Sequence, residues 1–336
     1  ATFSTKDIAM ISASAIAGLS TATIASLSTA QIGALSGSAI AAMTARQLQA
    51  LSTAQAEALT SNQVAALDSA QLAALSPEDI ATFSTKDLAA ITSDAIGGLS
   101  TGSVAALSAA QIAALSTGGI SGLTTRQIAA LGTAQAEALT SSQIAALNSE
   151  QLAAFGADDI ATFSTREIAS INAGAITGLS TAAIASLSST QVAALSTSAI
   201  GALETKQIKA LSSDQLDALT PAQVRALDAR QIAILGPSYI ASLTTAQIAA
   251  LSTAAISGLT TDQIIALSTA QAEALTSSQV AALSSRQVAA LNSDQLDTFS
   301  VSDMGAISAS AMAGLSTATL ASLTTSQIAA IGPAGL

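Results

Sequence analysis

Few side chains in this sequence could carry out acid–base or nucleophilic chemistry. Histidine and cysteine are absent, and Tyr239 is the only tyrosine, so the usual general base at neutral pH and the thiolate nucleophile are both missing. Serine and threonine are numerous, but a hydroxyl needs an adjacent base before it can attack a substrate. We therefore expect no enzymatic activity, no catalytic residue and no bound cofactor.

Two pairs of adjacent acids are the best candidates for a carboxylate dyad or a calcium site. They are Glu78-Asp79 and Asp158-Asp159, and each pair falls in the first turn of an expected helix, where the positive end of the helix dipole favours carboxylates. Neither is accompanied by the Asp-x-Asp-x-Asp-Gly pattern of a calcium loop. We interpret both pairs as helix-capping residues and predict no metal site.

The elements that would position any such residues follow an eight-residue period. Every eighth residue from Phe3 to Ile331 is Leu, Ile, Phe or Met, so the 336 residues form 42 copies of one octad. A typical copy is Ser28-Thr29-Ala30-Gln31-Ile32-Gly33-Ala34-Leu35. A short fixed period is typical of a solenoid.

The polar head of each octad predicts the start of a helix. Its first position is Ser or Thr in 32 of 42 copies, and Glu204 is the only residue there outside the set Ser, Thr, Asp, Asn and Gly. These are the preferred N-caps. Gln follows three residues later in 22 copies, which completes a capping box.

Proline placement supports the same helix starts. All four prolines directly follow the cap position, where the ring is tolerated; they are Pro77, Pro221, Pro237 and Pro333. One continuous helix is excluded, because eight residues rotate by about 800° and the apolar stripe would drift. Each octad should therefore hold one helix of about six or seven residues.

Helices this short are unstable alone, so they must stack. The sequence predicts an all-α solenoid of 42 capped helices in a single continuous array over residues 1–336, without terminal capping repeats. Small residues between the two apolar anchors would let neighbouring helices approach closely. A β-solenoid is the alternative architecture, although alanine-rich strands are disfavoured and would not need capping boxes.

Longer spacings suggest how the helices wind. Phe-Ile-Leu series of anchors start at Phe3, Phe83, Phe163 and Phe299, which are separated by 10, 10 and 17 octads. A superhelix of about three and a third octads per turn would place these starts on one face. Duplication of a segment without geometric meaning explains the same spacing.

Composition excludes two classes of partner. The 21 acids and 10 bases give a net charge of −11, whereas nucleic-acid binding needs a basic surface. Half of the residues are hydrophobic, but polar octad heads interrupt every apolar run, so no membrane span is expected. We predict neither nucleic-acid binding nor membrane insertion.

The consensus Leu-Ser/Thr-x-x-Gln-Ile-Ala-Ala, as in residues 243–250, resembles the Ala/Thr/Gln-rich octapeptide-repeat tracts of very large bacterial secreted or surface proteins of the adhesin or haemagglutinin type. The resemblance implies a structural or adhesive role outside the cell or at its surface.

Two functions remain open from the sequence. The first is the rod or shaft of an extracellular bacterial filament or long adhesin, with the chain itself as partner through head-to-tail assembly, since the first and last residues lie inside the repeat pattern. The second is a binding scaffold whose repeated surface recognises a partner or a periodic ligand such as a polysaccharide or ice.

Overall fold

A computed structural model describes residues 3–331 of the chain. Within these residues there are 41 α-helices of four to six residues and no strand. Each helix occupies one octad and is separated from the next by a few non-helical residues. The all-α solenoid of short capped helices predicted from the sequence is therefore confirmed, and the β-solenoid alternative is wrong.

The helices belong to two compact units, residues 1–171 and 172–336. The first unit contains α1 (Thr5–Ala9), α2 (Ala13–Ala17), α3 (Thr21–Ala25), α4 (Thr29–Ala34), α5 (Gly37–Ala41), α6 (Ala45–Gln49), α7 (Thr53–Glu57), α8 (Ser61–Val64), α9 (Ser69–Ala74), α10 (Pro77–Ala81), α11 (Thr85–Ala90), α12 (Ser93–Ile96), α13 (Thr101–Ala106), α14 (Ala109–Ala114), α15 (Thr117–Gly122), α16 (Thr125–Ile128), α17 (Thr133–Glu137), α18 (Ser141–Ala145), α19 (Ser149–Ala153), α20 (Ala157–Ala161) and α21 (Thr165–Ser170).

The second unit continues the same series of short helices. It contains α22 (Ala173–Ile176), α23 (Thr181–Ser186), α24 (Ser189–Ala194), α25 (Thr197–Ala202), α26 (Thr205–Ala210), α27 (Ser213–Asp217), α28 (Pro221–Ala226), α29 (Ala229–Ala233), α30 (Pro237–Ser242), α31 (Thr245–Ala250), α32 (Thr253–Gly258), α33 (Thr261–Ile265), α34 (Thr269–Glu273), α35 (Ser277–Ala281), α36 (Ser285–Ala290), α37 (Ser293–Asp297), α38 (Val301–Ala306), α39 (Ala309–Met312), α40 (Thr317–Ser322) and α41 (Thr325–Ala330).

The octad head starts each helix through the predicted capping box. Ser28, the N-cap of α4, has extended backbone angles of φ −72° and ψ 159°. Its hydroxyl accepts a hydrogen bond from the backbone N–H of Gln31 at 3.2 Å, and its own N–H donates to Gln31 Oε1 at 2.8 Å. Two N–H groups that the helix cannot satisfy internally therefore find acceptors.

The prolines follow this capping pattern, whereas Glu204 departs from it. Pro77, Pro221 and Pro237 occupy the first helical position as predicted, while Pro333 lies outside the described residues. Glu204, the exceptional N-cap, makes no side-chain cap and instead forms an exposed ion pair with Lys206 at 2.7 Å. Its N–H still donates to Gln207 Oε1, so the glutamine half of the box is sufficient to start α26.

The helices have four to six residues, so 19 of the 41 reach the six predicted from the sequence and the others are shorter. In the six-residue helices the anchor at the Leu position is the first residue to leave the helix. Leu107, which follows α13, has φ −67° and ψ 139°, an extended conformation. Its N–H closes a last bond to the carbonyl of Val104 at 3.2 Å. The Leu107 side chain is buried in the interior, and its extended backbone leads directly to Ser108, the N-cap of the next helix.

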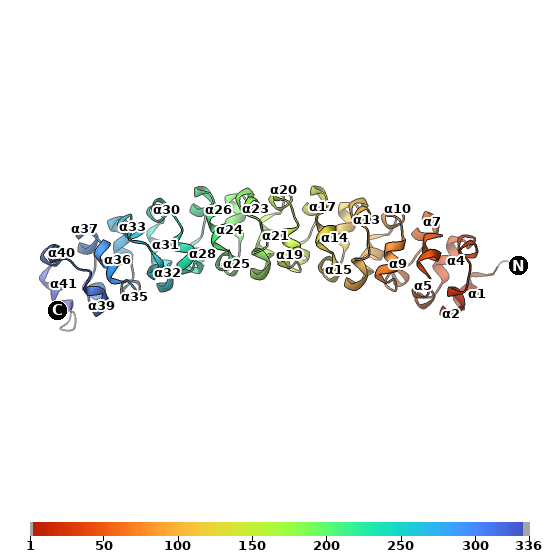
Figure 1. The fold of residues 1–336 in the computed structure, drawn as a ribbon, viewed down its shortest axis with the longest axis horizontal. Coiled ribbons are helices and arrows are strands. Elements are labelled where there is room, and N and C mark those ends of the chain that lie inside the picture. The colour runs from red at the N-terminus through yellow and green to blue at the C-terminus, as the bar shows by residue number, and fades with distance from the viewer. Residues whose placement is uncertain (1–2, 332–336) are drawn as a thin grey trace. The chain divides into compact units, whose positions relative to one another are not determined.

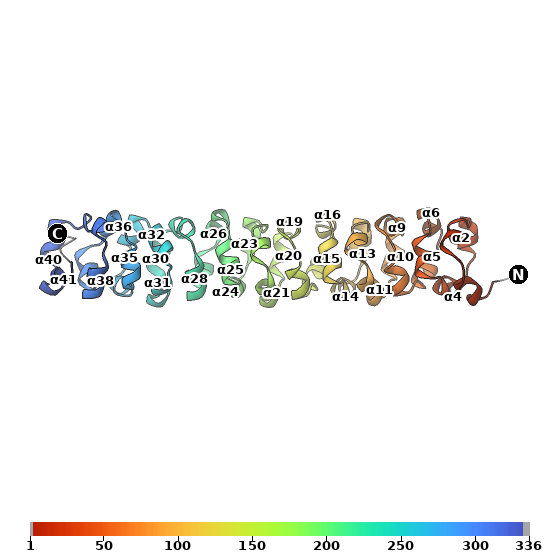
Figure 2. The ribbon, with the colours of Figure 1, turned by 90° about the horizontal axis from the view of Figure 1, so that it is seen from below.

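Stacking supplies the stability that single helices lack. In each unit a helix packs against the third helix along the chain: α10 lies against α13 in the first unit, and α29 lies against α32 in the second. Figures 1 and 2 show this winding of successive helices within each unit. The two anchors fill the interior; Ile120 and Leu123, for example, are 0% and 4% exposed.

Small residues allow the close approach that the sequence predicted. A β-carbon added at Gly98, Gly122, Gly258 or Gly314 would stand less than 3.0 Å from backbone atoms of the helix three octads earlier. No described residue, glycine included, has a positive φ. These glycines are therefore required for their missing side chain rather than for their backbone freedom.

Candidate functional site

The glutamine three residues after the cap joins different turns of the solenoid. In α16, Gln127 Oε1 accepts from Thr124 N–H at 2.7 Å, while Gln127 Nε2 donates to the carbonyls of Ile96 at 3.0 Å and Leu99 at 2.7 Å. The side chain is 2% exposed. One amide therefore caps its own helix and also satisfies carbonyls at the end of α12, four helices earlier.

The same bonds recur in both units and define the winding. Gln47 donates to the carbonyls of Ile16 and Leu19 in the first unit, and Gln231 donates to those of Ile200 and Leu203 in the second. Helices that pack together are three apart, whereas those joined by glutamine are four apart. Each turn therefore holds between three and four helices, in agreement with the three and a third suggested by the sequence.

The acidic pairs lie at helix starts, as the sequence indicated. Asp79 Oδ2 accepts hydrogen bonds from Ser76 N–H at 3.1 Å and Ser76 Oγ at 2.8 Å. Asp159 Oδ2 accepts from Gly156 N–H at 3.1 Å. Among residues 3–331, no group of three or more acidic side chains is placed to hold a metal ion.

Two other aspartates make contacts that sequence reasoning missed. Asp87 caps α11, and its second oxygen accepts a hydrogen bond at 2.7 Å from Ser61 Oγ on α8, three helices earlier. Asp303 repeats this contact with Ser277 at 2.7 Å. Their equivalent in the first octad, Asp7, bonds only within its own octad, to Ser4.

A cleft on the N-terminal face is lined by apolar anchors. The N-terminal face is the surface formed by Phe3, Ile11, Leu19 and Leu27. It encloses a groove of about 290 Å³ with Asp7 at its edge. Phe3 is 67% exposed and the other three anchors are half-buried. The same four residue types recur 80 residues later as Phe83, Ile91, Leu99 and Leu107, where preceding helices cover them and they are 2–4% exposed.

A second cavity surrounds the only tyrosine of the chain. It lies between α27 and α30, has a volume of about 250 Å³ and includes Ser213, Asp217 and Tyr239 in its wall. Tyr239 occupies the position that glutamine holds in most octads. Its side chain is 6% exposed, and its hydroxyl has no hydrogen-bond partner.

Three further clefts repeat one arrangement along the surface. In each, the N-cap of one helix faces the N-cap of the helix three further along, as in Asp68 with Thr92, Glu204 with Asp228, and Ser252 with Thr276. Their volumes are about 290, 460 and 300 Å³. Because they arise from the octad itself, such clefts belong to the repeat rather than to one specialised place.

No helix within residues 3–331 has the length and apolar character needed to cross a bilayer. This agrees with the interrupted apolar runs of the sequence.

Comparison with known proteins identifies the repeat. No curated protein sequence matches the chain. A family described as the ALTTAQ repeat matches ten times, at residues 1–37, 38–69, 64–101, 80–117, 117–149, 168–205, 200–229, 208–245, 232–269 and 240–277. These segments together span well over half of the chain, and many of their starting points differ by whole octads. The chain is a structural repeat protein and belongs to the ALTTAQ repeat family.

Proposed function

We propose that this chain is a non-enzymatic structural protein that forms the shaft of an extracellular bacterial filament or long adhesin, and that its copies stack head to tail. The observation that carries the proposal is the repeat itself: the same helix contacts and glutamine bonds recur along both units, so a second copy can continue the register of the first. The N-terminal face shows which groups such a contact would use. Its anchors have the same types and order as residues that are covered by other helices inside the solenoid. Burial of such an apolar surface against another molecule is favourable, because it removes apolar area from water.

The contacts made inside the solenoid indicate what would cover this face. Asp87 receives the hydroxyl of Ser61 at the first helical position of α8, and Gly98 receives the backbone of Ser69 at the first helical position of α9. Asp7 and Gly18 are the corresponding residues in the first two octads. A β-carbon at Gly18 would contact only carbonyls of its own helix, so the space beside it is open.

The last described helices carry the complementary groups. Thr317 and Thr325 are the first residues of α40 and α41, and Ile328 in α41 is 39% exposed. In a register that continues the octads, Thr317 of one copy would donate to Asp7 of the next, and the carbonyl of Thr325 would lie against Gly18. Such a contact does not close on itself, so it generates a filament.

The N-terminal face offers a matched pair of variants for testing assembly. Ile11→Asp places a charge in the groove at a half-buried site, whereas Met10→Asp places the same charge on a neighbouring residue that is 85% exposed. We expect end-to-end oligomers of the unmodified chain and of Met10→Asp in sedimentation velocity and electron microscopy, and a monomer for Ile11→Asp. Circular dichroism checks that both variants remain helical.

Ionic strength gives a second measurement. Each copy carries a net charge of −11, so copies repel one another at low salt and this repulsion is screened as salt rises. Oligomers should therefore lengthen with salt concentration. A chain that remains monomeric at every concentration and salt, or oligomers unaffected by Ile11→Asp, would contradict head-to-tail stacking.

The extracellular location is tested separately in the source cells. Antibodies against the chain should label intact cells, and added protease should remove the label. Labelling that requires cell lysis would contradict an exposed shaft, and it would leave the assembly measurements unaffected.

The repeated clefts between N-caps favour one second function, a scaffold for a periodic ligand such as a polysaccharide. Purified chain would then co-sediment with an insoluble polysaccharide, and binding would weaken when cap hydroxyls in one row are replaced by alanine. The ice-binding version requires thermal hysteresis, and a freezing point equal to the melting point would exclude it.

A further inference from the structure

The Tyr239 cavity differs from the repeated clefts because its centre breaks the octad pattern. Glutamine at this position would accept from the cap N–H and donate to carbonyls 28 and 31 residues earlier, as Gln231 does. Tyrosine can make neither contact with its ring. The N-cap, Gly236, also supplies no side-chain cap, so α30 has lost the polar contacts that hold most other helices.

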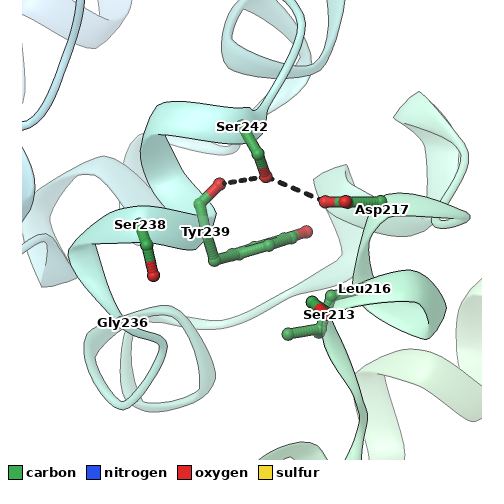
Figure 3. A pocket seen from close by; sticks show the side chains of 7 residues that line it. All are labelled: Ser213, Leu216, Asp217, Gly236, Ser238, Tyr239 and Ser242. Atoms are coloured by element: carbon green, nitrogen blue, oxygen red, sulfur yellow. Dashed lines mark hydrogen bonds between the residues drawn. The ribbon is translucent and has the colours of Figure 1, made fainter.

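The tyrosine hydroxyl lacks a partner inside this cavity. The oxygen is buried without any hydrogen bond, although the side chain is 6% exposed. Figure 3 shows the ring lying between α30 and α27, with its hydroxyl pointing toward the segment that carries Leu216 and Asp217. A buried hydroxyl without a partner is unfavourable, so a ligand with a polar atom at this point would gain a bond that the protein leaves unmade.

The only charged residue that lines the cavity is an acid, Asp217. Asp217 Oδ1 accepts a hydrogen bond from Ser242 Oγ at 2.8 Å, and Ser213 and Ser238 add hydroxyls to the wall. None of the residues that line the cavity is basic. A carboxylate and an aromatic ring in one small cavity are suited to a positively charged group.

We propose that the cavity between α27 and α30 binds a small organic cation of the amino-alcohol class. Its ammonium group pairs with the Asp217 carboxylate, its methyl or methylene groups pack on the Tyr239 ring, and its hydroxyl meets the Tyr239 hydroxyl. The volume of about 250 Å³ accommodates a molecule of this size. This site does not depend on the proposed filament.

Binding can be followed by the intrinsic fluorescence of the chain, because Tyr239 is its only tyrosine and it contains no tryptophan. Titration with ethanolamine or choline should produce a saturable change in tyrosine fluorescence. Sodium chloride at the same ionic strength should not. If neither amino alcohol changes the fluorescence beyond the salt control, the cavity holds water only and the proposal is overturned.

Two aspartates of α27 provide a matched control. Asp217→Asn should weaken ethanolamine binding about fivefold, the effect of losing one partly exposed ion pair. Asp214→Asn makes the same change in net charge on the same helix but outside the cavity wall, and it should leave binding unchanged. Equal weakening by both variants would indicate nonspecific attraction to an acidic surface and would overturn the site.

The role of the hydroxyl is tested by calorimetry with Tyr239→Phe, which keeps the ring and removes the oxygen. Binding of ethanolamine should weaken, whereas binding of tetramethylammonium, which has no hydroxyl, should be unaffected. Loss of both would contradict the assigned contact unless the unfolding temperature also falls. In that case the Asp217→Asn variant distinguishes a lost contact from a lost fold, because the Asp217 side chain is exposed.

Discussion

The carbonyl oxygen of Ser69 occupies the space in which a β-carbon of residue 98 would stand, and Gly98 has no such atom. This contact joins the start of α9 to the end of the octad that contains α12. It recurs between Gly258 and Ala229, and between Gly314 and Ser285. Close backbone approach is therefore a regular feature of certain octads.

Gly98→Ala should destabilise the chain by about 1–3 kcal/mol, because the added methyl group forces the two backbones apart. Gly18→Ala is the matched control, since Gly18 has the same place in its octad but open space beside it. In the dissociated monomer that variant should be neutral or slightly stabilising through higher helix propensity. Urea unfolding of the two variants measures the difference, and equal destabilisation would contradict the backbone contact.

Gln127→Glu should destabilise the chain by about 2–4 kcal/mol at neutral pH. The introduced carboxylate could still accept from Thr124, but it would place a buried negative charge against the carbonyls of Ile96 and Leu99. Gln31→Glu is the milder control, because Gln31 is half-buried and donates to only one carbonyl, that of Phe3.

The Gln127→Glu variant should also respond to pH in a defined direction. Burial beside carbonyls raises the pKa of the carboxyl group introduced at position 127 above its unfolded value, and the protonated form can donate a hydrogen bond. The deficit relative to the unmodified chain should therefore shrink as pH falls and grow as pH rises through the unfolded pKa. A pH-independent difference in urea midpoint would show that the two carbonyls do not act on this side chain.

Asp7 should titrate below its usual range. Hydrogen bonds from the side chain and then the backbone of Ser4 lower its pKa from the ordinary 3.8. Its contribution to α1 is therefore present above the unfolded pKa and is lost as pH falls through the folded one. Carboxyl-detected NMR should show this low value, and Ser4→Ala should raise it. An unchanged pKa in that variant would contradict the serine contact.

Tyr239 should resist ionisation at alkaline pH. Burial, and then the charge of Asp217, raise its pKa above the ordinary 10.0. The stabilisation from the neutral phenol is present below the unfolded pKa and is lost as pH rises toward the folded one. Absorbance of the single tyrosine follows this directly. Tyrosinate should form at a higher pH than in a free tyrosine, and Asp217→Asn should lower that pH because it removes the nearby negative charge.

Local structure could be predicted from the sequence because its causes lie within one octad. The Ser28 cap and the Gln31 side chain are three residues apart, and Pro77 follows its cap directly. Each of these signals acts through backbone groups of the same turn, so the helix starts were predicted correctly. The helix ends were predicted only in part: α13 ends directly before Leu107, as expected for six residues, whereas 22 of the 41 helices end one or two residues earlier.

Contacts between turns could not be predicted from the same signals. The amide of Gln127 reaches carbonyls 28 and 31 residues earlier, and a sequence without known pitch does not show which carbonyls these are. The place of Tyr239 in the glutamine column was visible, yet a lone tyrosine in a repeat gives no indication of a cavity. Asp217 lines that cavity only because α27 and α30 are neighbours three helices apart.

The short reach of the glutamine bonds has a consequence for how the protein is made. Gln47 finds the carbonyls to which it donates within the 31 residues that precede it, so each turn can be completed soon after it leaves the ribosome. No part of such a chain must wait for a distant segment before it folds. Synthesis of a much longer version would therefore expose no more unfolded polypeptide at any moment than synthesis of this one.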